Sequence, residues 1–170
     1  GSLNLMLKIW LPKQKGYLAH KFDIPNYKFF SNDCYKFNVN SSSEINVYSQ
    51  CNVTISYKSL KADLFISNIK INDNIKLIKT DFDQKISNNS RNISEINASE
   101  FNNHKNKVYG IYYSFIGNAP SNIQFYITDS ISNFTTGSLY FKTKPNYDSL
   151  LPSISYVKND IKKIFETFQW

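Results

Sequence analysis

Val108-Tyr-Gly-Ile-Tyr-Tyr-Ser-Phe115, Asn122-Ile-Gln-Phe-Tyr-Ile-Thr128 and Ser138-Leu-Tyr-Phe-Lys-Thr143 are three runs of aromatic and β-branched residues near the end of the chain. Such a composition is typical of β-strands. Turn-forming residues separate the runs, at 117–120 and at 129–133, and turns of this kind connect sequential strands. The segment therefore predicts a three-stranded antiparallel meander.

A helix is predicted after Ser149. Its apolar residues recur at spacings of three and four, which places them on one face of a helix. A short meander cannot bury its inner face alone, so we expect this helix to cover the sheet. Charged residues, Asp160 and Glu166 among them, are expected on the opposite side. The apolar face consists of Ile154, Val157, Ile161, Ile164, Phe165 and Phe168.

The earlier part of the chain shows further strand patterns and one more helix. Alternation of apolar and polar residues predicts strands at 17–22, 35–39, 44–48, 53–57 and 60–66. Residues 26–30 are expected to form a loop or a short helical turn. In residues 71–86 the period changes to three or four, which predicts a helix with Asp73 as its N-cap. Residues 87–106 fit either a ragged strand or a long exposed loop.

The N-terminal residues are apolar but form no membrane span. Gly1-Ser2 is typical of a cloning scar, and the apolar run at 3–11 is too short to cross a bilayer. This run is either a mobile tether or an extended arm that packs along the domain through Trp10. We expect an arm at 1–11 and a single domain at 12–170. The predicted fold class is α+β, an antiparallel meander with flanking helices and a C-terminal helix packed on the sheet.

The 170 residues carry a formal net charge of +7, yet the composition argues against a nucleic-acid partner. Nucleic-acid recognition relies heavily on arginine, and Arg91 is the only arginine in the chain. The abundance of Asn, Lys, Ile, Tyr and Phe is typical of an AT-rich genome and accounts for the basic balance. We therefore expect the lysines to form a solvated surface.

Residues with catalytic chemistry are scarce. His20 and His104 are the only histidines, and the chain has no glycine-rich phosphate loop, serine-hydrolase elbow or zinc-protease motif. Asp81 and Asp83 lie beside lysines on a predicted helix, as on a solvated helix face. Asp129 is expected to serve the turn that follows it. We predict no cofactor and no metal site, and an enzyme is the least favoured class.

Cys34 and Cys51 are the only cysteines, and they lie 17 positions apart, each just before a predicted strand. Their spacing fits neither a zinc knuckle nor a redox-active Cys-x-x-Cys pair. In an oxidising compartment they would form a disulfide, which would stabilise the fold by about 3 kcal/mol. In a reducing compartment they would be free thiols, and the residues alone leave both states open.

Several short sequence blocks, spread along the chain, are together similar to those of a known protein family. They are Pro12-Lys-Gln-Lys-Gly-Tyr17, Cys34, Cys51, Lys107-Val-Tyr-Gly110, Gly117-Asn-Ala119, Gln124-Phe-Tyr-Ile-Thr-Asp129, Gly137-Ser-Leu-Tyr-Phe141, Pro145-Asn-Tyr-Asp-Ser-Leu150, Asp160-Ile161, Glu166-Thr-Phe168 and Trp170. Together they resemble the gliding-motility lipoprotein GldD family of Bacteroidota. The resemblance runs from about residue 12 to 170, and its C-terminal blocks are the specific part.

The resemblance implies a periplasm-facing lipoprotein, anchored through an acylated cysteine upstream of residue 1, that is needed for gliding motility and type IX secretion. It implies no known enzyme activity. An oxidising periplasm favours the Cys34–Cys51 disulfide. Separately, two halves of a meander with a helix between them are similar to the Mog1/PsbP-like arrangement, an analogy that does not transfer function.

We therefore expect a non-catalytic module that binds other gliding or type IX secretion proteins of the cell envelope. Polar loops on a rigid sheet are a usual place for such contacts, although each residue concerned could serve only as a turn or cap. The alternative is a binder of an envelope glycan or small ligand that stacks on exposed aromatic rings. The candidate partner contacts are Asn118, Asn146, Tyr147 and Asp148.

Overall fold

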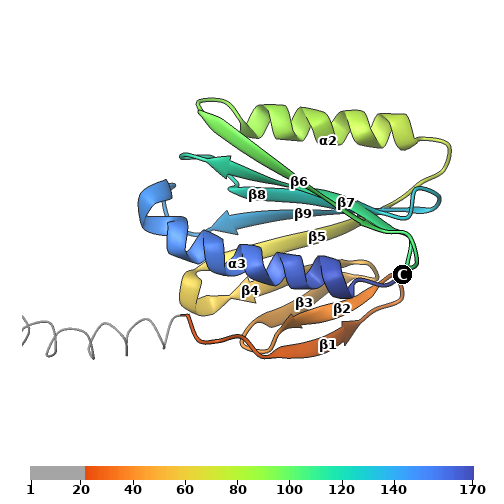
Figure 1. Ribbon diagram of the computed structural model, residues 1–170, viewed down its shortest axis with the longest axis horizontal. Coiled ribbons are helices and arrows are strands. Elements are labelled where there is room, and N and C mark those ends of the chain that lie inside the picture. The colour runs from red at the N-terminus through yellow and green to blue at the C-terminus, as the bar shows by residue number, and fades with distance from the viewer. Residues whose placement is uncertain (1–21) are drawn as a thin grey trace, which may run out of the picture.

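A computed structural model describes residues 22–170 (Figure 1). The predicted arm at 1–11 and all but the last residue of the strand expected at 17–22 lie outside the described residues, as do Trp10 and His20. The described elements are β1 (Tyr27–Ser31), β2 (Lys36–Asn40), β3 (Glu44–Ser49), β4 (Asn52–Tyr57), the 3₁₀ turn η1 (Lys58–Leu60), β5 (Ala62–Lys70), α2 (Ile75–Asn89), β6 (Glu95–Asn103), β7 (Val108–Ile116), β8 (Ile123–Thr128), β9 (Asn133–Phe141) and α3 (Tyr147–Thr167).

Seven strands form one antiparallel sheet in the order β3-β4-β5-β9-β8-β7-β6. Strands β3 to β5 make one meander and β6 to β9 make another, and the two meanders join where β5 pairs with β9. Helix α2 carries the chain from the inner strand β5 to the far edge at β6. Strands β1 and β2 form a separate antiparallel hairpin. The α+β class, with an antiparallel sheet and a C-terminal helix, is confirmed, whereas the Mog1/PsbP likeness stays a prediction.

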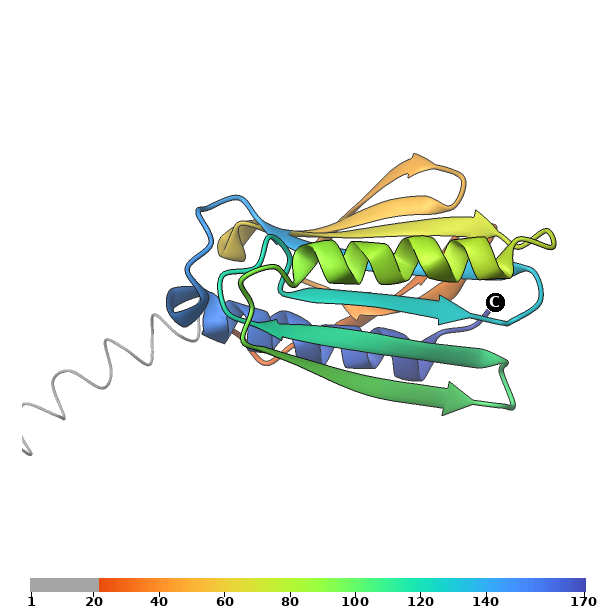
Figure 2. The same ribbon diagram turned by 90° about the horizontal axis from the view of Figure 1, so that it is seen from above.

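Helix α3 packs on one face of the sheet and α2 on the other (Figures 1 and 2). All six residues of the predicted apolar face of α3 are buried, so the period of three and four identified the packed side correctly. Near the C-terminal end of α3, Phe165 meets the ring of Phe125 on β8 with 5.2 Å between centroids. On the opposite face, Phe82 of α2 meets Tyr126 at 5.2 Å and Phe134 at 6.2 Å.

Gly137 on β9 permits the close approach of an aromatic ring. A Cβ atom at this position would overlap the ring of Phe125, which is fully buried. The absence of a side chain at Gly137 therefore leaves room for the ring of Phe125, which packs on Phe165. This is a packing requirement, because the backbone of Gly137 is ordinary strand.

Several sequence-based expectations about local structure are wrong. Residues 26–30 are mostly strand β1, because Phe30 pairs with Phe37 of β2 and their rings lie 5.4 Å apart. Strand β9 begins at Asn133, not at Ser138, because Asn133, expected in the turn, and residues 134–137, left unassigned, also pair with β5.

The start of α2 also differs from the prediction. Its N-cap is Asn74, and Asp73 precedes the helix with a positive φ of 55°. An aspartate tolerates this left-handed conformation better than most residues, so Asp73 serves the turn before the helix. Of the two possibilities for residues 87–106, a strand is observed over part of the range, at β6.

Candidate functional site

A group of polar side chains, most of them buried, surrounds Asp160 in the second half of α3. Asp160 is only 2% exposed. Its Oδ1 accepts a hydrogen bond from Tyr27 Oη on β1 at 3.0 Å. Its Oδ2 accepts hydrogen bonds from Asn40 Nδ2 on β2 and Tyr57 Oη on β4, both at 2.9 Å. One carboxylate thus joins the hairpin, the main sheet and the helix.

Asp160 was expected on the solvent side of the helix, and that expectation is wrong. It follows Val157 by three positions and precedes Ile164 by four, so it lies on the apolar stripe. The β1–β2 hairpin covers this part of α3 and removes Asp160 from water. The interruption of an apolar stripe by one carboxylate was the sequence signal that could have revealed the cluster.

The carboxylate of Asp160 is stabilised by neutral donors. Residues 22–170 form two ion pairs, Lys58–Glu44 and Lys142–Asp63, and neither involves Asp160. Burial raises the pKa of Asp160, and the hydrogen bonds from Asn40, Tyr57 and Tyr27 offset this only in part.

The same burial raises the pKa of Tyr57, and the nearby negative charge of Asp160 raises it further. The phenol therefore keeps its proton and remains a donor to Asp160. We call Asp160 with Tyr27, Asn40 and Tyr57 the clamp, because hydrogen bonds between these side chains join separate elements of the fold.

A hollow of about 300 Å³ opens beside this clamp. It lies between the first described residues and the β2–β3 turn, and Tyr156 Oη, at its wall, donates to the carbonyl of Asp23 at 3.2 Å and accepts from Asn40 Nδ2 at 2.9 Å. The polar groups of Asn40 and Tyr156 are therefore already engaged. The hollow is lined by Asp23, Ile24, Pro25, Asn26, Asn40, Ser41, Ser42 and Tyr156.

The four candidate partner contacts lie at the β7–β8 turn and the start of α3. Asn118 Oδ1 accepts a hydrogen bond from the backbone N–H of Tyr147 at 2.7 Å. Asn146 is the N-cap of α3, and its side chain accepts from the Ser149 N–H. Asp148 lies in the first helical turn, where a carboxylate is favoured by the helix dipole. We call this group, Asn118 and Asn146 to Asp148, the helix-start surface.

Three members of the helix-start surface, Asn118, Asn146 and Asp148, are exposed, and Tyr147 is half-buried against the main core. The structure brings together residues that lie 28 or more positions apart in the chain. It also gives Asn118 and Asn146 structural roles. Whether these residues touch a partner stays a prediction.

The two cysteines form a disulfide, with 5.7 Å between the Cα atoms of Cys34 and Cys51. It links the turn before β2 to the turn before β4. Tyr35, directly after Cys34, donates from its hydroxyl to the carbonyl of Cys51 at 2.9 Å. The covalent bond and the hydrogen bond therefore fix the same two turns.

Asp129 serves the turn after β8, as predicted. Its Oδ1 accepts from the backbone N–H groups of Ile131, Ser132 and Asn133 at 2.8–2.9 Å. Partial burial would raise the pKa of Asp129, but these hydrogen bonds to its charged form outweigh burial and lower it.

The other described residues that could take part in catalysis or metal binding do not form a group. His104 Nδ1 lies 3.3 Å from the hydroxyl of Tyr109. Among residues 22–170, no three His, Cys, Asp or Glu side chains are grouped so that they could hold a metal ion. A groove of about 410 Å³ lies between α2 and the sheet, and its lining includes the exposed side chains of Leu77 and Ile69 and the buried rings of Phe82 and Phe134.

These features define a disulfide-bonded α+β domain whose buried polar groups hold its elements together. The sequence model of the family described as gliding motility lipoprotein GldD matches residues 8–170, and the chain belongs to this family. Membership gives the protein a role in gliding motility and, as a lipoprotein, an anchor in a membrane of the cell envelope. No curated protein matches the chain significantly. None of the helices described within residues 22–170 is long and apolar enough to cross a bilayer.

Proposed function

We propose that this protein is a non-catalytic module on the periplasmic side of the envelope that acts by binding proteins of the gliding and type IX secretion machinery. The observation that carries the proposal is the hydrogen bond between Asn118 and the Tyr147 N–H. It holds a loop and a helix start from two distant parts of the chain as one preformed, exposed polar surface. Preformed surfaces bind with a smaller loss of conformational entropy than flexible ones.

The use of the buried polar groups supports the same proposal. Asp160 is bonded to three neutral donors, and Asp129 is bonded to its own turn. These two carboxylates are thus occupied in maintaining the fold, whereas the helix-start surface leaves the Asp148 carboxylate exposed. The exposed polar groups of the helix-start surface are therefore suited to binding a partner.

A glycan or small ligand is the weaker alternative. The exposed aromatic pair Phe65 and Tyr140 lies edge to face on the open part of the sheet, with 5.8 Å between ring centroids, and neither ring lines the groove beside α2. The rings within that groove are buried. Stacking on a sugar requires an accessible ring face inside a hollow, and the largest groove does not offer one. Half-buried rings do line two smaller hollows of about 200 Å³ and 190 Å³, Phe101 and Tyr112 in one and Tyr109 and Tyr126 in the other, which keeps the glycan as the second candidate.

Charge reversal at Asp148 tests the proposal. The Asp148→Lys variant would replace the natural copy in a bacterium that depends on this family member for gliding, and colony spreading and secretion would be measured together with the amount of protein in the envelope. We expect normal protein levels with reduced spreading and secretion, because the carboxylate offered to the partner becomes a cation.

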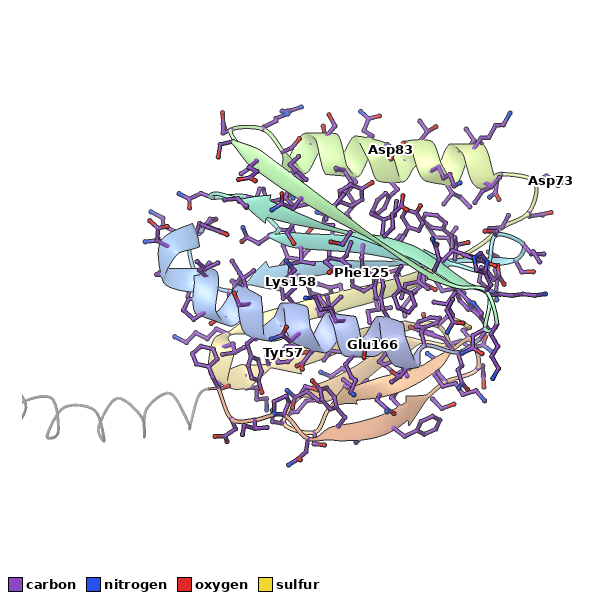
Figure 3. The ribbon with its side chains drawn as sticks, in the orientation of Figure 1. Tyr57, Asp73, Asp83, Phe125, Lys158 and Glu166 are labelled. Carbon is purple, nitrogen blue, oxygen red and sulfur yellow. A yellow bond between two sulfur atoms is a disulfide. The ribbon has the colours of Figure 1, made fainter. Side chains whose placement is uncertain are left out.

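Asp83→Lys is the matched control. Asp83 is an exposed carboxylate on α2, the helix on the opposite face of the sheet (Figure 3), and its reversal changes the net charge by the same amount. We expect spreading and secretion to remain normal in this variant. Equal loss in both variants, or normal function in both, would contradict the assignment of the partner contact to the helix-start surface.

A further inference from the structure

A small hollow opens between helix α3 and the two strands at one edge of the sheet, β6 and β7. It has a volume of about 200 Å³, and its lining includes the buried ring of Phe165 and the half-buried rings of Phe101 and Tyr112. The hollow lies near the C-terminal end of α3, whereas the helix-start surface lies at the beginning of that helix. We call the lining residues the aromatic hollow: Glu100, Phe101, Tyr112, Lys162, Phe165 and Glu166.

Close packing at Gly110 on β7 brings the three rings of the hollow together. Gly110 pairs with Phe101 of β6, and a Cβ atom on Gly110 would lie only 3.1 Å from the ring of Phe165. The Phe165 ring meets the rings of Phe101 and Tyr112 at interplanar angles of 77° and 87°, with 5.8 and 5.7 Å between centroids. The aromatic part of the hollow is thus fixed by packing before any ligand binds.

Phe101 and Tyr112 each keep a ring face that no other ring covers. Among the rings of residues 22–170, only Phe165 contacts either of them, and a single ring contact covers at most one face. The second small hollow offers less, because its Tyr126 stacks on Phe134 with 4.7 Å between centroids. An aromatic face is electron-rich, so the uncovered faces in the aromatic hollow suit the polarised C–H groups of a sugar ring.

Two carboxylates and two ammonium groups surround these rings. Glu100, Glu166 and Lys162 line the hollow. Lys158, on the same helix as Glu166 (Figure 3), lies beside it, with Nζ 5.8 Å from the centroid of the Tyr112 ring. None of these four charged residues belongs to the two ion pairs of residues 22–170, so their polar ends can bond to a ligand. The formal charges cancel, which gives the site donors and acceptors without a net charge.

We propose that the aromatic hollow binds one sugar residue of an uncharged glycan. The C–H face of the sugar stacks on Phe101, and its hydroxyls donate to the two carboxylates and accept from the ammonium group of Lys162. This site is separate from the helix-start surface, so the inference holds whether or not the proposed protein partner binds there.

The charges of the hollow select against other classes of ligand. Neither a cation nor an anion gains net attraction from a site whose charges cancel. The position over the Tyr112 ring, which would suit a cation, is taken by Lys158. A wholly apolar ligand would remove the charged groups from water without replacing their hydrogen bonds, which is costly. A neutral ligand that carries many hydroxyls avoids all three penalties.

Nuclear magnetic resonance titration of the full chain tests the site. Isotope-labelled protein would be titrated with methyl β-D-glucopyranoside, methyl N-acetyl-β-D-glucosaminide, maltotriose and chitotriose. We expect at least one of these neutral sugars to bind with a dissociation constant of roughly 0.1–10 mM. The shift changes of backbone amides should centre on residues 99–102, 110–113 and 162–166. Methyl β-D-glucuronide, which carries a carboxylate, should bind more weakly than the best neutral sugar, and equal or tighter binding would contradict a neutral ligand.

Two variants and their controls measure the contribution of the ring and of a carboxylate. Phe101→Ala removes the stacking ring and should weaken binding at least about tenfold, whereas Phe65→Ala, at an exposed ring outside the hollow, should leave it unchanged. Glu166→Ala removes an acceptor at an exposed position and should weaken binding about threefold or more. Glu95→Ala, an exposed carboxylate on β6 outside the hollow, is its matched control. Thermal unfolding by circular dichroism establishes that each variant folds.

Three results would overturn the proposal. The first is the absence of binding by all four neutral sugars at about 50 mM. The second is a set of shift changes centred outside the aromatic hollow. The third is unchanged binding by the folded Phe101→Ala and Glu166→Ala variants. The Asp148→Lys variant should bind the sugar normally, because Asp148 lies outside the hollow, so this proposal and the proposed protein partner can fail separately.

Discussion

Tyr57 Oη donates a 2.9 Å hydrogen bond to Asp160 Oδ2 and so joins β4 to α3 across 103 positions of the chain. Figure 3 shows Tyr57 next to α3. The same carboxylate accepts from Tyr27 and Asn40 in the β1–β2 hairpin. Because this hairpin is not part of the seven-stranded sheet, the clamp at Asp160 is a principal polar link between the hairpin and the body of the protein.

Removal of the clamp should destabilise the fold. Asp160→Ala leaves the buried hydroxyl of Tyr57 and the half-buried hydroxyl of Tyr27 without their acceptor, whereas Asn40 Nδ2 keeps its hydrogen bond to Tyr156. Each buried unsatisfied donor costs about 1–3 kcal/mol. Partial relaxation and entry of water reduce the total, so we expect a loss of about 2–4 kcal/mol in the free energy of unfolding, measured by guanidinium denaturation.

Asp83→Ala, at the exposed site on α2, is the control for Asp160→Ala and should change stability by less than about 0.5 kcal/mol. If Asp160→Ala also lowered the free energy of unfolding by less than about 0.5 kcal/mol, the hydrogen bonds of the clamp would make no net contribution to stability.

Alkaline pH should weaken the fold through the buried tyrosines. Burial raises the pKa of Tyr35 to about 12, compared with about 10 in an unfolded chain. The unfolded state therefore releases this proton first, so the stability contributed by the neutral phenol is complete below pH 10 and is lost as the pH rises toward 12.

Guanidinium unfolding of the wild type and of Tyr35→Phe between pH 9 and 12 measures this effect. Relative to the variant, the wild type should lose up to about 2–3 kcal/mol over the range. Parallel pH profiles for the two proteins would contradict the assignment to Tyr35.

Cleavage of the disulfide should cost about 3 kcal/mol, because the loop between Cys34 and Cys51 spans 17 positions and its closure restricts the unfolded chain. Chemical denaturation of the Cys34→Ser, Cys51→Ser double variant measures the cost. The addition of a reductant should lower the stability of the wild type and leave that of the double variant unchanged. Equal sensitivity to the reductant would refute a stabilising bond.

Gly137→Ala should be among the most damaging single methyl additions in the sheet. The new Cβ would overlap the buried ring of Phe125, which packs on Phe165, and overpacking of this kind typically costs about 1–3 kcal/mol. Ser67→Ala, on the neighbouring strand, is a control without such an overlap. A normal melting temperature for Gly137→Ala would mean that Phe125 can move aside at no cost.

The sequence correctly predicted the elements that a local pattern of residues is sufficient to identify. The apolar face of α3 and the helix between the two meanders follow from spacing, and the strands at β7 and β8 follow from their aromatic and β-branched composition. The pairing of β5 with β9 and the strand at β1 could not be predicted, since both depend on partners distant in the chain. The start of β9 was placed too late for the same reason, because the pairing of residues 133–137 with β5 cannot be read from the local sequence.

Prediction of the candidate site was uneven for a related reason. Asn118 and Tyr147 were singled out separately as loop and helix-start residues, and only the structure shows the hydrogen bond that unites them. Asp160 was assigned to the solvent because it was grouped with the charged residues expected opposite the apolar face of the helix. The hairpin that buries it comes from residues more than a hundred positions earlier.

Photo-crosslinking in living cells tests the central claim, that the protein functions by binding a partner through the helix-start surface. A photoreactive amino acid would be placed at position 148, and at Lys76 on α2 as a matched exposed control. The account predicts a discrete crosslinked product at position 148, containing a gliding or secretion protein, and none at position 76. No product at position 148, or the same products at both positions, would contradict it.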